Sequence, residues 1–232
     1  LSMPGAFAED DASKAFLKSA AKLTGADTLS LTLDRKVTPA LAQSLGLPEK
    51  AKVTVVADRP AHIMISASPA EGEARDLYYD GKALTLFDSA ANIYATAEME
   101  GDIDKLIAGL EEKFGFSPPI IDLFHTEVGE MLASDAFTKK EVVKGDGGTS
   151  LKFTAKELTV QAWMGEDGLP AKIVFTMAGK EGSPTIAFEN MKWNLEAELS
   201  ESSFAFSKPE GAEKADLLNT EEIEEMLSKK EK

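Results

Sequence analysis

The sequence contains two histidines, His62 and His125, and no cysteine. The lack of cysteine excludes thiol nucleophiles, disulfides and cysteine-ligated zinc, so a zinc site would need both histidines together with carboxylates. His62 falls in a predicted strand and His125 in a predicted helix, and nothing in the sequence brings them together. We interpret each as a structural histidine and expect neither a metal site nor a cofactor.

The other residue types that support catalysis do not occur in a catalytic pattern. There is no G-x-S-x-G, P-loop, H-E-x-x-H or dinucleotide-binding glycine motif. Paired carboxylates such as Glu111-Glu112 lie on polar helical surface, whereas glycosidase carboxylates face each other across a cleft. Residues 145–148 (Gly-Asp-Gly-Gly) lack the downstream acidic ligands of a calcium loop and predict a turn. We therefore expect no catalytic residues and no enzymatic activity.

The charge balance limits the possible partners. Forty acidic and 25 basic residues give a net charge of −15 over 232 residues. Such a surface repels phosphate backbones, so we expect no nucleic-acid binding. No apolar run approaches the length of a transmembrane helix, so we also expect no transmembrane segment.

The N-terminal residues indicate a compartment. Ala6-Phe7-Ala8 matches the small-x-small pattern that precedes a signal-peptidase cut, and Pro4-Gly5 supplies a helix break ahead of it. We interpret residues 1–8 as a signal-peptide remnant, which predicts export. The alternative is a chance match in a tail or tag scar. The lack of cysteine suits an oxidising compartment.

The segment Arg75–Ala97 predicts three short strands joined by two turns. Asp80-Gly81 between apolar runs is typical of a type I′ hairpin turn, which needs φ > 0 at both central residues. Because strand side chains alternate, Leu84 points to one face of the sheet and Phe87 to the other. Tyr94 likewise points to the face opposite that of Ile93 and Ala95. Both faces therefore carry large apolar groups, and a helix, another sheet or a ligand must cover the second face.

The rest of the chain predicts an α+β fold with about ten antiparallel strands that curl into a barrel or half-barrel. Residues 9–216 are expected to form one domain, and residues 217–232 a C-terminal helical tail. Helices are predicted at Asp11–Leu23, Ile103–Phe114 (capped by Asp102), Ile120–Ala133 and Asn219–Lys229, and a helical turn is predicted between Pro39 and Gly46. Further strands are predicted at Thr28–Val37, Lys52–Ala57, Ala61–Ala67, Thr138–Lys144, Thr149–Ala155, Leu158–Met164, Ala171–Ala178, Pro184–Leu195 and Ser203–Ser207.

Several of these strands are apolar on both faces, as in the Arg75–Ala97 segment. A curved sheet of this kind can pack helices on one side and leave an apolar cavity on the other, or the same side chains can simply fill a core. The residues expected to line such a hydrophobic ligand cavity are Ile63, Ile65, Phe87, Tyr94, Trp163, Phe175, Met177, Met191 and Trp193.

Several motifs resemble those of a bacterial family of predicted periplasmic proteins of unknown function. They are Arg59-Pro60, Leu77–Lys82, Leu84–Asp88, Ile93–Ala95 and Phe204–Ala212. The hairpin Ala162–Pro170 is similar to an element of the wider lipoprotein localisation factor (LolA/LolB-like) superfamily. That superfamily also includes mycobacterial lipid-carrier lipoproteins and RseB-like envelope-stress regulators. The resemblance spans Asp11–Asp216.

The resemblance implies a fold, a compartment and a function. The fold is an unclosed antiparallel half-barrel whose concave side is covered by helices, and the compartment is the periplasm. The function is that of a non-enzymatic binding or carrier protein for a lipid, a lipoprotein acyl chain or a similar hydrophobic ligand of the cell envelope. The alternative is an envelope protein-interaction or stress-sensor module that binds a protein partner at a free strand edge without carrying lipid.

Overall fold

The computed structural model describes residues 9–69, 72–115, 117–118, 120–145, 148–178 and 182–217. The chain divides into two compact units. Unit 1 comprises Leu1–Gly25, Leu31–Val53 and Glu127–Asn194, and unit 2 comprises Ala26–Ser30, Thr54–Thr126 and Leu195–Lys232. The expected signal-peptide remnant at 1–8 and the expected helix at 219–229 lie outside the described residues, and a single domain over 9–216 stays a prediction.

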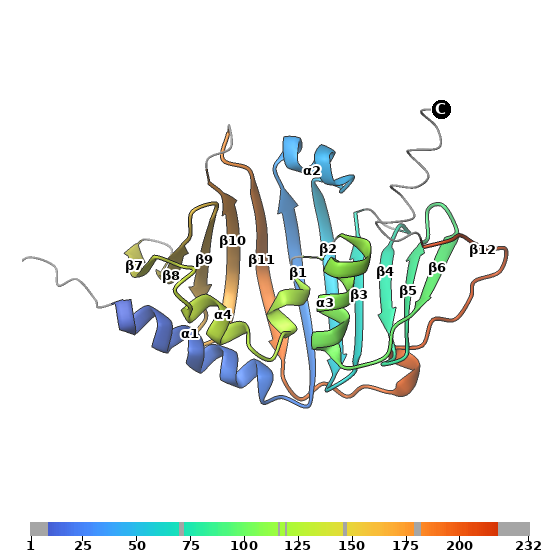
Figure 1. The fold of residues 1–232 in the computed structure, drawn as a ribbon, viewed down its shortest axis with the longest axis horizontal. Coiled ribbons are helices and arrows are strands. Elements are labelled where there is room, and N and C mark those ends of the chain that lie inside the picture. Colours follow the sequence, from blue (N-terminus) through green and yellow to red (C-terminus); the bar gives the residue numbers. More distant parts are fainter. Residues whose placement is uncertain are drawn as a thin grey trace, which may run out of the picture. The chain divides into compact units, whose positions relative to one another are not determined.

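The strands are hydrogen-bonded in the order β12-β6-β5-β4-β3-β2-β1-β11-β10-β9-β8-β7 (Figure 1). Strands β3 to β6 and β7 to β11 form antiparallel pairs, whereas the short β12 runs parallel to β6. Because β12 and β7 are the two ends of this order, the sheet is unclosed. The predicted α+β fold with a mostly antiparallel, unclosed sheet is thus confirmed.

Most strand bounds lie within two residues of those predicted, because the alternation that marks them is local. The strands are β1 Thr28–Val37, β2 Lys50–Asp58, β3 His62–Ser68, β4 Arg75–Tyr79, β5 Ala83–Asp88, β6 Ile93–Glu98, β7 Lys139–Gly145, β8 Gly148–Thr154, β9 Leu158–Met164, β10 Pro170–Met177, β11 Thr185–Asn194 and β12 Glu213–Lys214.

In unit 1, helices pack on one face of the strands. Helix α1 (Glu9–Thr24) contacts β7 and β8, and it also packs against the short helix α4 (Val128–Ala133). The Phe16 ring of α1 meets the Phe153 ring of β8 edge-on at 5.5 Å. Gly129 brings α4 close to α1, because a Cβ atom at this position would lie 2.9 Å from Ala20. We call the face that α1 covers the helix side of unit 1. The third helix of this unit, α2 (Pro39–Leu45), connects β1 to β2.

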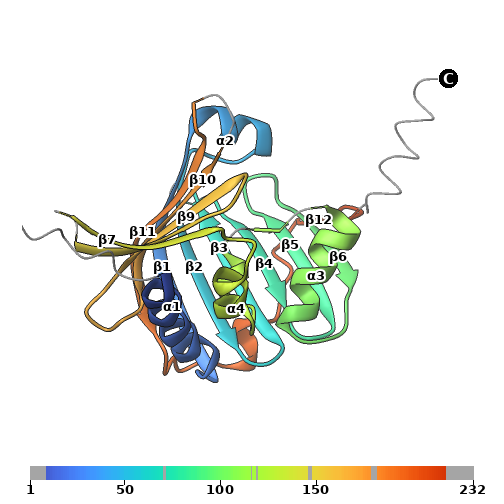
Figure 2. The same ribbon diagram turned by 60° about the vertical axis from the view of Figure 1, so that its left-hand side comes forward.

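In unit 2, helix α3 (Ile103–Phe114) lies against one face of the strands (Figures 1 and 2). Its ends follow the predicted signals: the Asp102 carboxylate accepts a hydrogen bond from the Lys105 N–H, and Gly115 closes the helix with φ of +66°. The Tyr79 hydroxyl donates to the Gly101 carbonyl at 2.9 Å, just before the helix. Burial raises the pKa of Tyr79 to about 12, so this hydroxyl keeps its proton.

The opposite face of unit 2 is covered by the chain's own C-terminal segment, residues 195–217, which we call the strap. Its Phe206 ring lies 5.1–5.7 Å from the rings of Tyr78, Phe87 and Tyr94. Phe204 stacks on His62 at 5.3 Å, and further along the strap forms β12 beside β6. Figure 2 shows the strap passing the strands on the side away from α3. The second apolar face of Arg75–Ala97 is therefore covered by protein.

The strap corrects one predicted strand. Residues 203–207 do not form a strand: Glu201–Ser203 is a 3-10 helix, and the chain then runs without regular structure to Pro209. Phe204 and Phe206 alternate as residues of a strand would, because both side chains contact the sheet. The strand that does form, β12, was missed because two residues carry no periodicity.

Two further predictions were wrong in detail. The predicted helix Ile120–Ala133 is broken into a 3-10 helix at Ile121–Phe124 and α4. It breaks because the Asp104 carboxylate of α3 accepts hydrogen bonds from the Thr126 N–H and hydroxyl. The turn at Asp80-Gly81 is not type I′, since only Gly81 has a positive φ. The Asp80 carboxylate instead accepts from the N–H groups of Lys82 and Ala83.

Candidate functional site

The candidate site lies on the helix side of unit 1, where cross-strand pairing places apolar side chains in rows. Residues directly opposite each other in an antiparallel pair share a face. Phe153 contacts α1. Pairing places it in one row with Val160, Phe175 and Ile186. The neighbouring row contains Leu151, Ala162, Ile173 and Phe188, all at most 1% exposed. This second row is a filled core.

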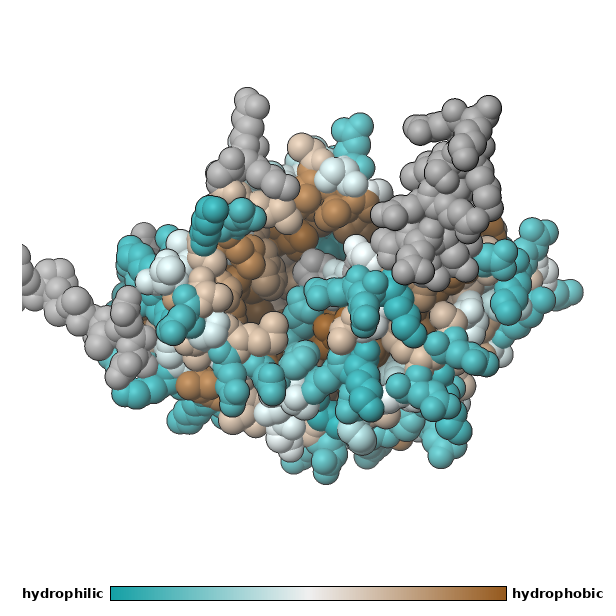
Figure 3. All heavy atoms as spheres, in the orientation of Figure 1, coloured by the Kyte–Doolittle hydropathy of each residue, from teal (hydrophilic) through white to brown (hydrophobic). Residues whose placement is uncertain are grey.

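The cover becomes thinner along β10 toward the β10–β11 turn. Ile173 is 1% exposed, whereas Phe175 and Met177, two and four residues further on the same face, are half-buried. Leu158, which pairs with Met177, is half-buried as well. In Figure 3, brown side chains surround a recess over β10 and β11, below α2. The helix side of unit 1 thus leaves an apolar surface uncovered at this end.

A groove opens on the same face, between α1 and strands β7 to β9. Its volume is about 380 Å³, within the range of small-molecule sites. The floor is apolar: Leu151 is buried, and Val142 and Met164 are half-buried. Lys18 and Lys22 of α1 lie on one wall. We call this feature the lysine groove.

The β9–β10 turn closes one end of the lysine groove with Glu166, Asp167 and Gly168. The exposed Lys22 ammonium donates to the Asp167 backbone carbonyl at this end of the groove. The Asp167 carboxylate accepts the Leu169 N–H at 2.9 Å and is thereby directed into its own turn. The groove thus combines an apolar floor with two ammonium groups and two carboxylates around it.

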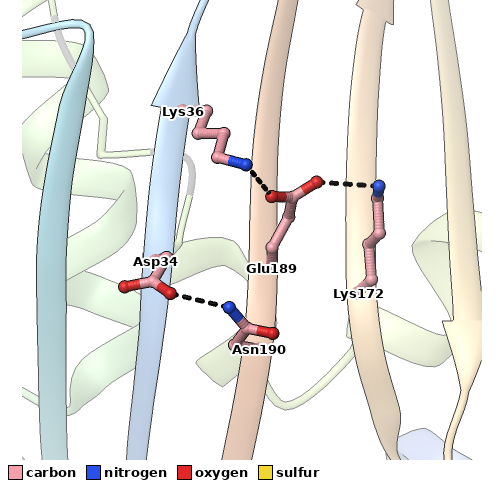
Figure 4. Close-up of polar contacts among 5 residues, drawn as sticks. All are labelled: Asp34, Lys36, Lys172, Glu189 and Asn190. Carbon is pink, nitrogen blue, oxygen red and sulfur yellow. Dashed lines mark hydrogen bonds and ion pairs between the residues drawn. The ribbon is translucent and has the colours of Figure 1, made fainter.

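The opposite face of β10 and β11 is polar. The Glu189 carboxylate lies between the Lys36 and Lys172 ammonium groups, the latter at 2.8 Å (Figure 4). Hydrogen bonds from Lys172 and Lys36 hold the pKa of Glu189 below its usual range. Asn190, next to Glu189, donates to Asp34 at 2.7 Å on the same side of the sheet. On this outer face, the described contacts of Asp34, Lys36, Lys172, Glu189 and Asn190 are ion pairs and hydrogen bonds.

The nine residues predicted to line a cavity do not form one wall. In unit 2, Ile63 and Ile65 are buried and pair with Tyr79 and Leu77 on the side of α3. Phe87 and Tyr94 lie on the other face, beneath Phe206 of the strap. Ligand binding by these four residues stays a prediction.

In unit 1, the remaining five predicted residues divide between the two faces. Phe175 and Met177 lie on the uncovered apolar surface of the helix side. Trp163 pairs with Ser150 and Lys172 on the outer face, where the Lys172 ammonium lies 5.2 Å from its ring centroid.

The last two predicted residues, Met191 and Trp193, lie beyond a break in the alternation of β11. Asn190 has φ of +54°, and the buried positions accordingly shift from Ile186 and Phe188 to Met191, three residues further on. Trp193 is half-buried and its indole N–H donates to the Pro170 carbonyl at 2.8 Å.

Sequence reasoning missed the residues of the lysine groove. Lys18 and Lys22 are one helical turn apart, and this spacing is visible in the sequence. Charged residues at this spacing indicate only the exposed side of a helix. The floor residues Val142, Leu151 and Met164 are more than 100 positions away in the chain. No local pattern predicts that α1 docks beside them.

A second open groove of about 610 Å³ lies in unit 2, between α3 and the β5–β6 hairpin. Its rim carries three lysines and three glutamates, and its other lining residues are Ala83, Met99, Ala108 and Gly109. Among the described residues, no group of three or more histidine and carboxylate side chains could hold a metal ion. No described helix is long and apolar enough to span a membrane.

The sequence matches the model of a protein family over residues 12–218, and this family is described as predicted periplasmic protein (DUF2092). The chain belongs to this family. The family description agrees with the periplasmic location expected from the sequence. No curated protein matches the sequence.

Solved structures with a similar fold have low identity to this chain. The lipoprotein LppX of Mycobacterium tuberculosis is 14% identical, with a TM-score of 0.47 over 83% of this chain and 100% of LppX. LprF of Mycobacterium bovis is 11% identical, with a TM-score of 0.44 over 90% of this chain and 100% of LprF. MucB of Pseudomonas aeruginosa, solved with MucA, is 12% identical, with a TM-score of 0.45 over 85% of this chain and 61% of MucB. At these values the function must be argued from the chain itself.

Proposed function

We propose that the protein is a non-enzymatic periplasmic carrier that binds the apolar chain of a lipid, a lipoprotein or a similar amphiphile. One observation carries the proposal: the helix side of unit 1 leaves Leu158, Phe175 and Met177 half-buried beside a filled core. An uncovered apolar surface costs roughly 25 cal/mol per Å² in water, and a bound apolar chain recovers that free energy.

The chemistry of this surface fits an apolar chain better than a reaction. Methionine is flexible and adapts to irregular apolar ligands, and Met177 and Met164 both lie on the helix side. Within the described part of unit 1, no acid–base pair with a shifted pKa lies beside these residues. The pKa of Glu189 is shifted, but its carboxylate lies on the outer face.

A second candidate function is the binding of an extended protein segment at β7. This strand is one end of the sheet order, and an edge strand can accept another strand through its backbone. However, β7 carries Lys139, Lys140 and Lys144, and lysines on an edge strand are a common protection against such pairing. We therefore prefer the carrier.

Two adjacent positions of β10 test the carrier directly. Met177 lies on the helix side, and Thr176, one residue away, lies on the outer face. Met177→Asp places a charge on the apolar surface and is expected to weaken binding of a fluorescent fatty-acid analogue at least about tenfold, since burying an unpaired charge costs several kcal/mol. Thr176→Asp adds the same charge and should leave binding unchanged.

Thermal unfolding of both variants provides the control for folding. If Met177→Asp melts well below the wild type, Met177→Gln replaces it, because glutamine has a similar length and no charge. Equal binding by Met177→Gln, Thr176→Asp and the wild type would contradict the proposed site.

A further inference from the structure

We infer that helix α2 docks the protein onto the surface of a lipid bilayer, and that Leu45, at the end of this helix, enters the apolar boundary of the membrane. Helix α2 connects β1 to β2 and lies beyond the ends of both strands (Figures 1 and 2). The docking is argued from α2 and its surroundings in unit 1. Its use in loading the ligand rests on the proposed function, because a carrier of amphiphiles collects them from a membrane.

The sequence around α2 lacks charge. Residues 37–48 form the longest run in the sequence without aspartate, glutamate, lysine or arginine, although 28% of all residues are charged. Such a run would be buried in a core strand, yet five of the seven residues of α2 are exposed. An exposed segment without charge loses no ionic hydration when it leaves water for a bilayer, whereas a charged side chain would oppose the transfer.

Leu45 is the apolar tip of this segment. Its side chain is 49% exposed, more than any other large apolar side chain that the structure describes. Gly46 then ends the helix with φ of +61°, and the half-buried Leu47 and Pro48 lead back to β2. Leu45 is therefore the large apolar group of α2 that a membrane surface can reach.

The base of α2 is fixed to the sheet. Leu41 and Ala42 are buried beneath the helix. The Thr38 N–H donates to the Thr185 carbonyl at 3.0 Å, and the Thr185 N–H donates to the Thr38 hydroxyl at 3.1 Å. Because these contacts hold the helix in place, Leu45 stays exposed, and docking requires no rearrangement of the backbone.

The same base places α2 next to the uncovered apolar surface of unit 1. Thr185 pairs with Thr176, which lies between Phe175 and Met177 on β10. The recess over β10 and β11 is accordingly found below α2 (Figure 3). A bilayer in contact with Leu45 therefore lies beside the surface that is proposed to take the apolar chain.

A membrane fits α2 better than a protein partner does. A seven-residue helix with one large apolar tip does not supply the roughly 800 Å² that each partner buries in a stable protein interface. Membrane-surface helices instead bind through inserted apolar side chains with lysines nearby. Lys50 and Lys52 are exposed just after the uncharged run, and Glu49 is the acidic residue beside them. This small positive excess suits lipid phosphates, but Leu45 carries the docking.

A fluorescent label tests the docking directly. The chain has no cysteine, so Ser44→Cys, at the exposed position before Leu45, can be labelled alone with an environment-sensitive fluorophore. Addition of phosphatidylcholine vesicles should shift the emission of this label to shorter wavelength. The same label on Lys192→Cys, at an exposed position of β11, should keep its emission.

Two aspartate variants of the unlabelled chain assign vesicle binding to Leu45. Leu45→Asp should weaken binding in a vesicle sedimentation assay about tenfold or more, because it removes the inserted leucine and adds a charge. Met131→Asp is the matched control, since Met131 of α4 is 47% exposed and receives the same charge outside α2. It should bind vesicles as the wild type does. Both side chains are exposed, so both variants should unfold at the temperature of the wild type.

Three results would overturn the docking. Equal vesicle binding by Leu45→Asp and the wild type, or an equal loss in Met131→Asp, would show that α2 is not the docking element. A wild type that sediments as a dimer, with a monomeric Leu45→Asp, would assign α2 to a second copy of the chain.

The docking and the carrier fail separately. If the label at position 44 does not respond to vesicles while the fatty-acid analogue binds, the docking is contradicted and the carrier stands. If the label responds but no fatty-acid analogue binds, the carrier fails and the docking stands.

Discussion

The residues of β10 show how one strand supplies both a core and an uncovered surface. Ile173, Phe175 and Met177 share the helix side, and only Ile173 is fully covered. Alternation along a strand is enough to place these three residues on one face. It could not predict which face α1 covers or where that cover ends, because both depend on the docking of a helix about 150 residues away. Trp163 was predicted to line the same cavity, yet alternation along β9 places it on the outer face.

Asp122 allows a test at a single ionisable group. Burial and the nearby charge of Glu111 raise the pKa of its carboxyl group to about 6, although Ser117 and His125 oppose the shift. A raised carboxyl pKa means that the folded state holds its proton more tightly than the unfolded state, whose pKa is near 3.8. Stability is therefore lost as the pH rises from about 4 to above 6.

We expect Asp122→Asn to remove this loss. The difference between the two pKa values corresponds to at most about 3 kcal/mol, and partial exposure reduces it to about 1–2 kcal/mol. The variant should unfold with a higher free energy than the wild type at pH 8, and the difference should disappear near pH 4. Urea unfolding at both values measures it. A difference that does not change with pH would show that burial of the charge is not its cause.

At the scale of elements, local signals determined some segments and tertiary contacts determined others. Strand β1 and helix α3 were predicted with their observed bounds, because alternation, an Asp cap and a terminal glycine all lie within the segment. The break before α4 could not be predicted, because the carboxylate that accepts the Thr126 N–H is that of Asp104 in another helix.

The structure of the strap was the least accurately predicted from the sequence, although its aromatic residues were noted. Phe206 is half-buried among three aromatic rings, and Ala212 is buried near β12. The backbone continues to hold the edge of the sheet: the Glu213 N–H donates to the Asn92 carbonyl and the Ala215 N–H to the Tyr94 carbonyl. The strap therefore covers both a face and an edge of unit 2.

We expect Phe206→Ala to release this cover. Loss of a partly buried phenylalanine and its ring contacts should lower the free energy of unfolding by about 2 kcal/mol. Hydrogen exchange at the Glu213 and Ala215 amides should become faster, while the amides of unit 1 keep their rates. Ser207→Ala, at the next, exposed position, is the control. Unchanged exchange at both amides would mean that Phe206 does not anchor the strap.

At the scale of the whole molecule, charge is unevenly divided between the two units. Unit 1 contains fifteen basic and fifteen acidic residues, whereas unit 2 contains ten basic and twenty-five acidic residues. All of the net charge of −15 therefore belongs to unit 2. The unit with the proposed binding surface is neutral, so an anionic amphiphile meets no net repulsion from it at short range.

Native mass spectrometry of the protein purified from a bacterial envelope tests the central claim, that unit 1 carries an apolar chain, most directly. The wild type and Thr176→Asp should each appear with one bound amphiphile, and Met177→Asp should appear at the mass of the bare chain. A wild type found only at the mass of the bare chain, or an equal amount of bound lipid on Met177→Asp, would contradict the account.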